Sequence, residues 1–105
     1  MLFTLLGGTS IVLAQCTPGT YDYHGCPNRI NYVPGNNYTP NGTNTYTWPT
    51  SVPGAYLVSG QGTGAAYYMF TGLGHINIPV TISNTFYNCT YTMIQHFHVQ
   101  QYSTP

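Results

Sequence analysis

Histidine can act as an acid, a base or a metal ligand, and this sequence contains four: His24, His75, His96 and His98. His96 and His98 are two residues apart, so in a β-strand their side chains lie on one face, about 7 Å apart along the backbone. Three imidazoles with an open fourth position form a known zinc arrangement, and imidazole also suits copper. His75, His96 and His98 are therefore the residues that could hold Zn or Cu. The interpretation that we favour is that they are polar side chains on the wet face of a strand, and we expect no cofactor.

Two alternating segments must position these histidines. Residues 75–83 alternate between apolar and polar side chains, and residues 86–100 do the same with Gln95 as the exception. Period-two alternation is typical of strands that bury one face. Pro79 cannot donate to a ladder, so it indicates a sheet edge or a bulge at that point of the first segment.

A hairpin between these two segments brings the histidines together. Pairing Val80 with Cys89 keeps the two apolar faces on the same side. In that register His75 lies opposite Ile94 and diagonal to His96. The hairpin therefore predicts that three imidazoles gather on one polar face.

Other catalytic chemistry has few residues to use. Asp22 is the only carboxylate of the chain, and Arg29 is the only Lys or Arg. A single carboxylate excludes two-carboxylate glycosidases and aspartic proteases, and the absence of Lys excludes P-loop and Schiff-base mechanisms. Asp22 and His24 could serve a Ser-His-Asp triad, but no Gly-x-Ser-x-Gly motif accompanies them. We therefore expect no catalytic residues and no enzymatic activity.

Charge is nearly absent from the whole chain. Only 2% of the 105 residues are charged, against roughly 25% in an ordinary domain, and the net charge is zero. Nucleic acid and anionic membranes are therefore not expected partners. This composition resembles that of charge-poor extracellular glycoprotein subunits of thermoacidophilic archaea, which form filaments or pili by donor-strand addition. The resemblance implies a structural protein whose partners are copies of itself and N-linked glycans.

The remaining pattern favours strands joined by turns. Six prolines between residues 18 and 53 break any long helix, and short strands are expected at 29–33, 44–48, 55–59 and 65–71. We expect an all-β fold. Its architecture would be a small antiparallel β-sandwich, immunoglobulin-like or related, with a loop-rich N-terminal half.

The first fourteen residues form an apolar segment that precedes a single β domain at 15–105. The segment is signal-like, although its start carries no basic residue, and it is too short for a stable membrane span. It is either a cleaved leader or a retained donor strand for assembly. The assembly residues would be Leu2, Phe3, Leu5, Leu6, Ile11, Val12 and Leu13.

Cysteines and sequons favour an extracellular location. Cys16 and Cys26 are the local candidates for a disulfide, which leaves Cys89 free or an alternative partner. The sequons place N-glycosylation at Asn37, Asn41 and Asn88. The alternation of residues 86–100 puts Asn88 on the solvent face of its strand.

The way in which the predicted sheets shield their edge strands bears on the choice between a structural subunit and a binding module. Soluble β-proteins guard their sheet edges with Lys, Pro or inward charges, and this chain has almost no charge to use. We therefore expect a non-enzymatic structural subunit of an extracellular or cell-surface assembly (filament, pilus or sheath) that self-associates by β-strand addition. The alternative is a secreted monomeric binding module for a glycan or a His-bound metal, with Trp48 among the candidate aromatic contacts.

Overall fold

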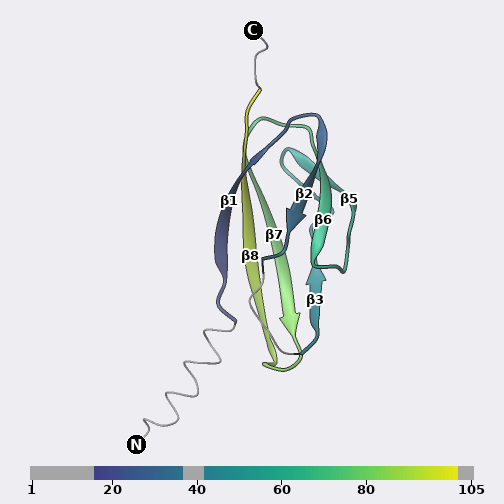
Figure 1. Cartoon of the computed structure of the whole chain (residues 1–105), viewed down its shortest axis with the longest axis vertical. Coiled ribbons are helices and arrows are strands. Elements are labelled where there is room, and N and C mark those ends of the chain that lie inside the picture. Colours follow the sequence, from purple (N-terminus) through teal and green to yellow (C-terminus); the bar gives the residue numbers. More distant parts are fainter. Residues whose placement is uncertain (1–15, 37–41, 102–105) are drawn as a thin grey trace, which may run out of the picture.

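The strands of the protein form two sheets that face each other (Figure 1). The computed structural model describes residues 16–36 and 42–101. One sheet has the strand order β1-β8-β7-β3 and the other has the order β2-β6-β5-β4. The fold is an all-β sandwich with mostly antiparallel pairing, as the sequence predicts. Its strands are β1 (Gly19–Gly25), β2 (Arg29–Pro34), β3 (Asn44–Thr47), β4 (Ser51–Val52), β5 (Ala55–Ser59), β6 (Ala65–Phe70), β7 (Gly74–Asn84) and β8 (Cys89–Val99).

The hydrophobic core fills the space between the two sheets. Alternation along β7 and β8 directs every second side chain inward, which confirms the apolar faces predicted for these segments. The ring of Phe70 on β6 packs edge-on against Phe97 on β8, with 5.0 Å between ring centroids, so the two sheets are in direct contact. The core consists of Val33, Trp48, Ala55, Ala66, Tyr68, Phe70, Ile76, Ile78, Val80, Ile82, Tyr91, Met93, Phe97 and Val99.

The pairing of β7 with β8 is shifted by four residues from the predicted hairpin. His75 lies opposite His98, four residues beyond its predicted partner. The reason is the connection, because residues 85–88 form a turn and are not part of the ladder. The side chain of Asn84 stabilises this turn by accepting the backbone N–H of Tyr87 at 2.8 Å. Four is an even number, so the side chains within β7 and β8 keep their predicted faces.

The prediction of a loop-rich N-terminal half misses β1. This strand pairs in parallel with β8, from Gly19 opposite Met93 to Gly25 opposite Val99. Glycine and proline around β1 suggest turns, and its partner lies at the other end of the chain. The short alternation of residues 20–24 is the only local sign of a strand in this segment.

The disulfide joins Cys16 to Cys89, which corrects the predicted bridge between Cys16 and Cys26. Cys16 lies just before β1 and Cys89 begins β8, so the parallel pairing of these strands brings their Cα atoms to 6.4 Å. Cys26 follows the far end of β1, roughly 30 Å away along an extended strand, which no disulfide can span. Its thiol is free and exposed.

Gln95 is fully buried, which explains why it interrupts the alternation of β8. Its Nε2 donates to the carbonyl of Gly35 at 3.0 Å, and its Oε1 accepts from Nδ2 of Asn36 at 2.9 Å. Nδ2 of Asn36 also donates to the hydroxyl of Tyr23 on β1. The buried amide therefore ties the loop after β2 to the opposite sheet.

Trp48 is 1% exposed, so its predicted role as a surface contact for a glycan or partner is wrong. Its indole N–H donates to the carbonyl of Thr63 at 2.8 Å. The side chain of Gln61 bonds both the N–H and the C=O of Trp48, at 2.7 and 2.8 Å. Beside it, the buried hydroxyl of Tyr68 donates to the carbonyl of Pro49. Trp48 is a core residue held in place by the loop between β5 and β6.

The other predicted strands are confirmed. The segments 29–33, 44–48, 55–59 and 65–71 correspond to β2, β3, β5 and β6, with ends that differ by one residue at most. Pro79 lies beyond the last residue of β7 that pairs with β3. It therefore occupies a local edge of the sheet, as the sequence predicts.

Candidate functional site

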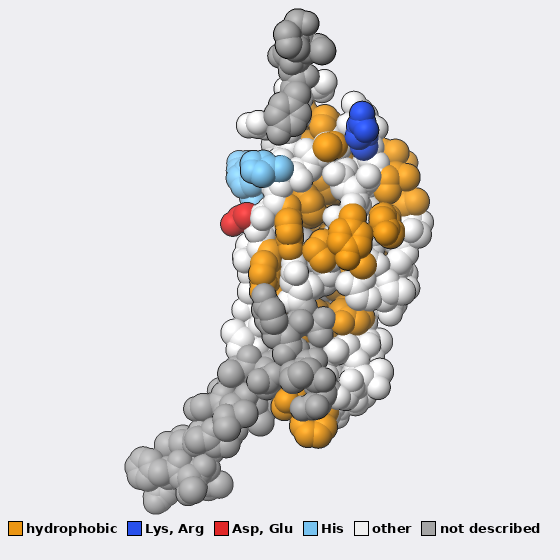
Figure 2. Space-filling model, viewed as in Figure 1, with side chains coloured by type: hydrophobic (Ala, Val, Ile, Leu, Met, Phe, Trp, Pro, Cys, Tyr) orange, Lys and Arg blue, Asp and Glu red, His pale blue; other side chains and the backbone are white. Residues whose placement is uncertain are grey.

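All four histidines of the chain gather on the outer face of the β1-β8-β7 sheet (Figure 2). The register places His24 of β1 and His75 of β7 on either side of His98 of β8. His96 lies two residues before His98 and therefore faces the same way. From the His98 ring, centroid distances are 4.7 Å to His75, 4.8 Å to His96 and 5.8 Å to His24. The structure thus brings together the three histidines singled out from the sequence, and it adds His24.

The three rings present nitrogen atoms close enough to share one ligand. One ring nitrogen from each of His75, His96 and His98 lies within 4.8 Å of the other two. The shortest separation is 3.0 Å, between Nδ1 of His75 and Nε2 of His96. His75 is exposed and the other two are half-buried, so solvent reaches the cluster.

Two further polar residues lie on either side of His96, on the strands that pair with β8. The register pairs His96 with Asn77 of β7 on one side and with Asp22 of β1 on the other. Oδ1 of Asn77 accepts a hydrogen bond from Nδ1 of His96, which leaves the lone pair of Nε2 directed at His75. Asp22 is the only carboxylate in the sequence, and Figure 2 shows it next to the histidines.

Sequence reasoning did not place Asp22, His24 and Asn77 beside the three histidines. One signal was present, because Asp22 and His24 have the same two-residue spacing as His96 and His98. That spacing gains meaning only once β1 is known to pair with β8.

The outer face of the other sheet exposes large apolar side chains. The exposed apolar face, as we define it, consists of Ile30 and Tyr32 on β2, Tyr67 on β6, and Tyr56 and Val58 on β5. These side chains are between 42% and 56% exposed. The rings of Tyr32 and Tyr67 contact each other across the strands, with centroids 5.6 Å apart. Figure 2 shows hydrophobic side chains close together on the part of the surface below the single arginine. A sheet face of this kind is typical of an interaction surface.

Within residues 16–36 and 42–101, one side of the β2 backbone pairs with no other strand. β2 ends its sheet and pairs with β6. The N–H of Gly35, just past β2, donates to the carbonyl of Gly64 at 2.9 Å. Because hydrogen-bonded pairs alternate along an antiparallel ladder, the odd-numbered residues of β2 bond to β6. The backbone groups of Ile30 and Tyr32 therefore point to the open edge.

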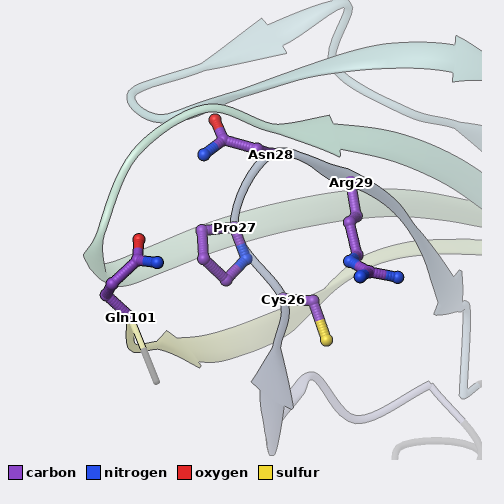
Figure 3. A pocket seen from close by; sticks show the side chains of 5 residues that line it. All are labelled: Cys26, Pro27, Asn28, Arg29 and Gln101. Carbon is purple, nitrogen blue, oxygen red and sulfur yellow. The ribbon is translucent and has the colours of Figure 1, made fainter. Parts of the chain in front are cut away.

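A shallow pocket of about 460 Å³ lies where β1 turns into β2 (Figure 3). The side chain of Asn31 holds this turn, because its Oδ1 accepts the N–H of Cys26 and its Nδ2 donates to the Cys26 carbonyl, both at 3.0 Å. The lining residues offer a thiol and a guanidinium but no acid or imidazole, so they contain no acid–base pair. The residues that line the pocket are Cys26, Pro27, Asn28, Arg29 and Gln101.

Asn88 is the predicted glycosylation site that the structure describes. It is exposed, with a φ of 52°, in the turn between β7 and β8 and not on a strand face as predicted. The register shift described above accounts for this difference. Asn37, Asn41 and the predicted N-terminal segment 1–14 with its assembly residues lie outside the described residues.

Comparisons with known proteins give a similarity in fold alone. No known family and no curated protein matches the chain. Among solved structures, the chain is similar to a 2,6-sialyltransferase of Photobacterium sp. JT-ISH-224, of the Vibrionaceae, with a TM-score of 0.55 and 5% identity. The match covers 80% of this chain and 18% of the enzyme, so it concerns one part of a much longer protein. Within residues 16–36 and 42–101, no helix is long and apolar enough to cross a membrane.

Proposed function

We propose that the protein is a non-enzymatic structural subunit of an extracellular or cell-surface assembly, such as a filament, pilus or sheath. Subunits self-associate by β-strand addition. The observation that carries the proposal is the open backbone edge of β2 beside the exposed apolar face.

The chemistry of this edge supports strand addition. Arg29 and Pro34 stand at the two ends of β2, whereas residues 30–33 between them carry no charge. Unprotected edges of this kind are templates for a further strand. An added strand would form backbone hydrogen bonds with Ile30 and Tyr32 and would extend the apolar face next to them.

The proposed occupant of the edge is the apolar segment 2–13 of a second copy of the chain. This segment carries no charged residue, like the edge that would receive it. Twelve residues in an extended strand span roughly 40 Å, which exceeds the length of β2. Exchange of this segment from subunit to subunit would produce an open chain of subunits.

An extracellular setting agrees with the covalent chemistry of the molecule. The disulfide between Cys16 and Cys89 needs an oxidising compartment to persist. The exposed turn that holds Asn88 is open to a glycosylating enzyme. Peptide mass spectrometry before and after removal of N-glycans would show whether Asn88 is occupied.

The first test compares the full chain with a version that lacks residues 1–13. Negative-stain electron microscopy and sedimentation velocity are expected to show filaments for the full chain and monomers for the truncated one. Filaments formed by the truncated chain would refute the role of the N-terminal segment. Dispersed monomers of the full chain would refute assembly altogether.

The second test addresses the edge itself with a matched pair of variants. Tyr32→Pro removes a backbone N–H that faces the open edge, and Tyr32→Thr removes the same aromatic ring but keeps that N–H. Both variants should remain folded in circular dichroism, because residue 32 does not bond to β6. Assembly is expected to be lost with proline and retained with threonine. Equal assembly of the two variants would show that the edge of β2 does not receive a strand.

The alternative function, a monomeric binding module, is favoured by a different observation. The histidine cluster described above can bind a ligand whether or not the subunits assemble. By contrast, the aromatic residue Trp48 is buried and offers a glycan no surface.

A further inference from the structure

We propose that His75, His96 and His98 bind one divalent transition-metal ion on the outer face of the β1-β8-β7 sheet. Zinc and copper are the ions that fit, because imidazole nitrogen is a preferred ligand of both. Magnesium and calcium prefer oxygen ligands, and this site offers few of them. The inference concerns a different face of the molecule from the open edge of β2 and does not depend on assembly.

The spacing of the ring nitrogens suits a shared ion. Two nitrogens that bind one tetrahedral zinc ion at 2.0–2.1 Å lie about 3.3 Å apart. The separation of 3.0 Å between His75 Nδ1 and His96 Nε2 is already near this value. His98 also offers a ring nitrogen, and one nitrogen from each of the three rings lies within 4.8 Å of the other two, so modest side-chain rotations complete the set. The backbone that carries these rings is the paired ladder of two eleven-residue strands, which fixes their relative positions.

The hydrogen bonds orient one ring for binding. In a neutral His96 ring whose Nδ1 donates to Asn77, Nε2 carries the lone pair. Nδ1 of His75 is then the donor in its contact with His96. On binding the ion, neutral His75 would move its proton from Nδ1 to Nε2 by exchange with water. Both facing lone pairs would then be free for the ion, with no net proton released.

The surroundings complete the case for a site. Every imidazole of the chain and its only acidic side chain occur on this one patch. Asp22, in register with His96, supplies the negative charge next to the ion. Asn77 is a positioning residue, because it acts through His96.

The test is calorimetric titration of the folded full chain with zinc or copper(II) chloride. The protein should carry no polyhistidine tag and should have Cys26→Ser, because the exposed thiol of Cys26 is itself a soft ligand. One ion is expected to bind per chain. His96→Asn is expected to weaken binding by about 100-fold, and Asn77→Ala by about tenfold. Asn77→Asp keeps an oxygen acceptor for His96 and is expected to restore binding.

The controls separate this site from other metal ligands. His24→Gln alters the one histidine outside the proposed set and should leave zinc affinity within about threefold, which is far less than a lost ligand costs. With copper, electron paramagnetic resonance should show coupling to imidazole nitrogen that weakens in His96→Asn. The absence of binding above a magnesium control would overturn the proposal. Binding that survives the combined His75→Asn, His96→Asn and His98→Asn substitutions would do the same, and an equal loss with His24→Gln would overturn the three-ligand assignment.

Discussion

Tyr68 carries its hydroxyl into the interior of the sandwich, where it donates to the carbonyl of Pro49. Burial raises the pKa of Tyr68 from 10.0 to about 12, because the phenolate form loses its hydration there. Above pH 10 the unfolded chain therefore loses this proton before the folded chain does. The free energy of unfolding should fall as the pH rises from 10 towards 12, and the contribution of Tyr68 is fully present below pH 10.

Urea denaturation across this pH range, in a Cys26→Ser background, tests the expectation. Tyr68→Phe should remove the part of the decline that belongs to this residue, although loss of the hydrogen bond lowers stability by about 1 kcal/mol at every pH. Tyr67→Phe alters an exposed tyrosine of the same strand and should keep the decline. Identical slopes for Tyr68→Phe and the parent chain would contradict the assignment.

At the scale of elements, the disulfide joins the starts of β1 and β8. Cys16 and Cys89 are separated by 73 positions, and closing a loop of this length is worth roughly 4 kcal/mol in the chain-entropy estimate. The pair Cys16→Ser and Cys89→Ser should therefore lower the free energy of unfolding by up to roughly 4 kcal/mol, measured by urea denaturation. Cys26→Ser should change it by less than about 0.5 kcal/mol. A comparable loss with Cys26→Ser would mean that Cys26 takes part in the bridge.

Local patterns in the sequence were sufficient for most elements. Alternation alone located β7 and β8 and assigned their buried faces correctly. The errors arose where a partner is distant in the chain. β1 was missed because β8 pairs with it from the other end, and the choice of Cys26 as the partner of Cys16 followed from that omission. In the sequence, Gln95 stands out as a polar residue on the apolar face of β8. Its hydrogen-bond partners in the loop after β2 could not be predicted.

For the candidate metal site too, local spacing predicted part of the arrangement, whereas the rest depends on strand pairing. The two-residue spacing of His96 and His98 placed them on one face, and any even shift of the hairpin keeps His75 on that same face. The sequence could not give the register, since residues 86–88, the first three of the apparent strand, belong to the turn. It also could not give Asn77, Asp22 or His24 as neighbours, because these depend on that register and on the parallel pairing with β1.

At the scale of the whole molecule, the near absence of charge predicts how the proposed assembly would respond to salt. Asp22 and Arg29 are the only two acidic or basic side chains besides the histidines. Contacts made by backbone hydrogen bonds and apolar side chains are not screened, so raising the salt from about 0.1 M to about 1 M should not dissolve the assemblies. The sedimented mass of protein measures this. The variant Asp22→Asn with Arg29→Gln should assemble as the parent does, and assemblies that dissolve in high salt would instead indicate charged contacts.

The parallel pairing of β1 with β8 also orders events in time. Of the strands that the structure describes, β1 is synthesised first and β8, which lies beside it, is synthesised last. The hairpin of β7 and β8 can form quickly from neighbouring residues, whereas β1 must close a loop that spans most of the chain, which is a slow step in folding. The sandwich and its disulfide therefore cannot be completed until β8 has been synthesised. Until then, β1 must remain without the strand beside which it folds, and the thiol of Cys16 without its partner.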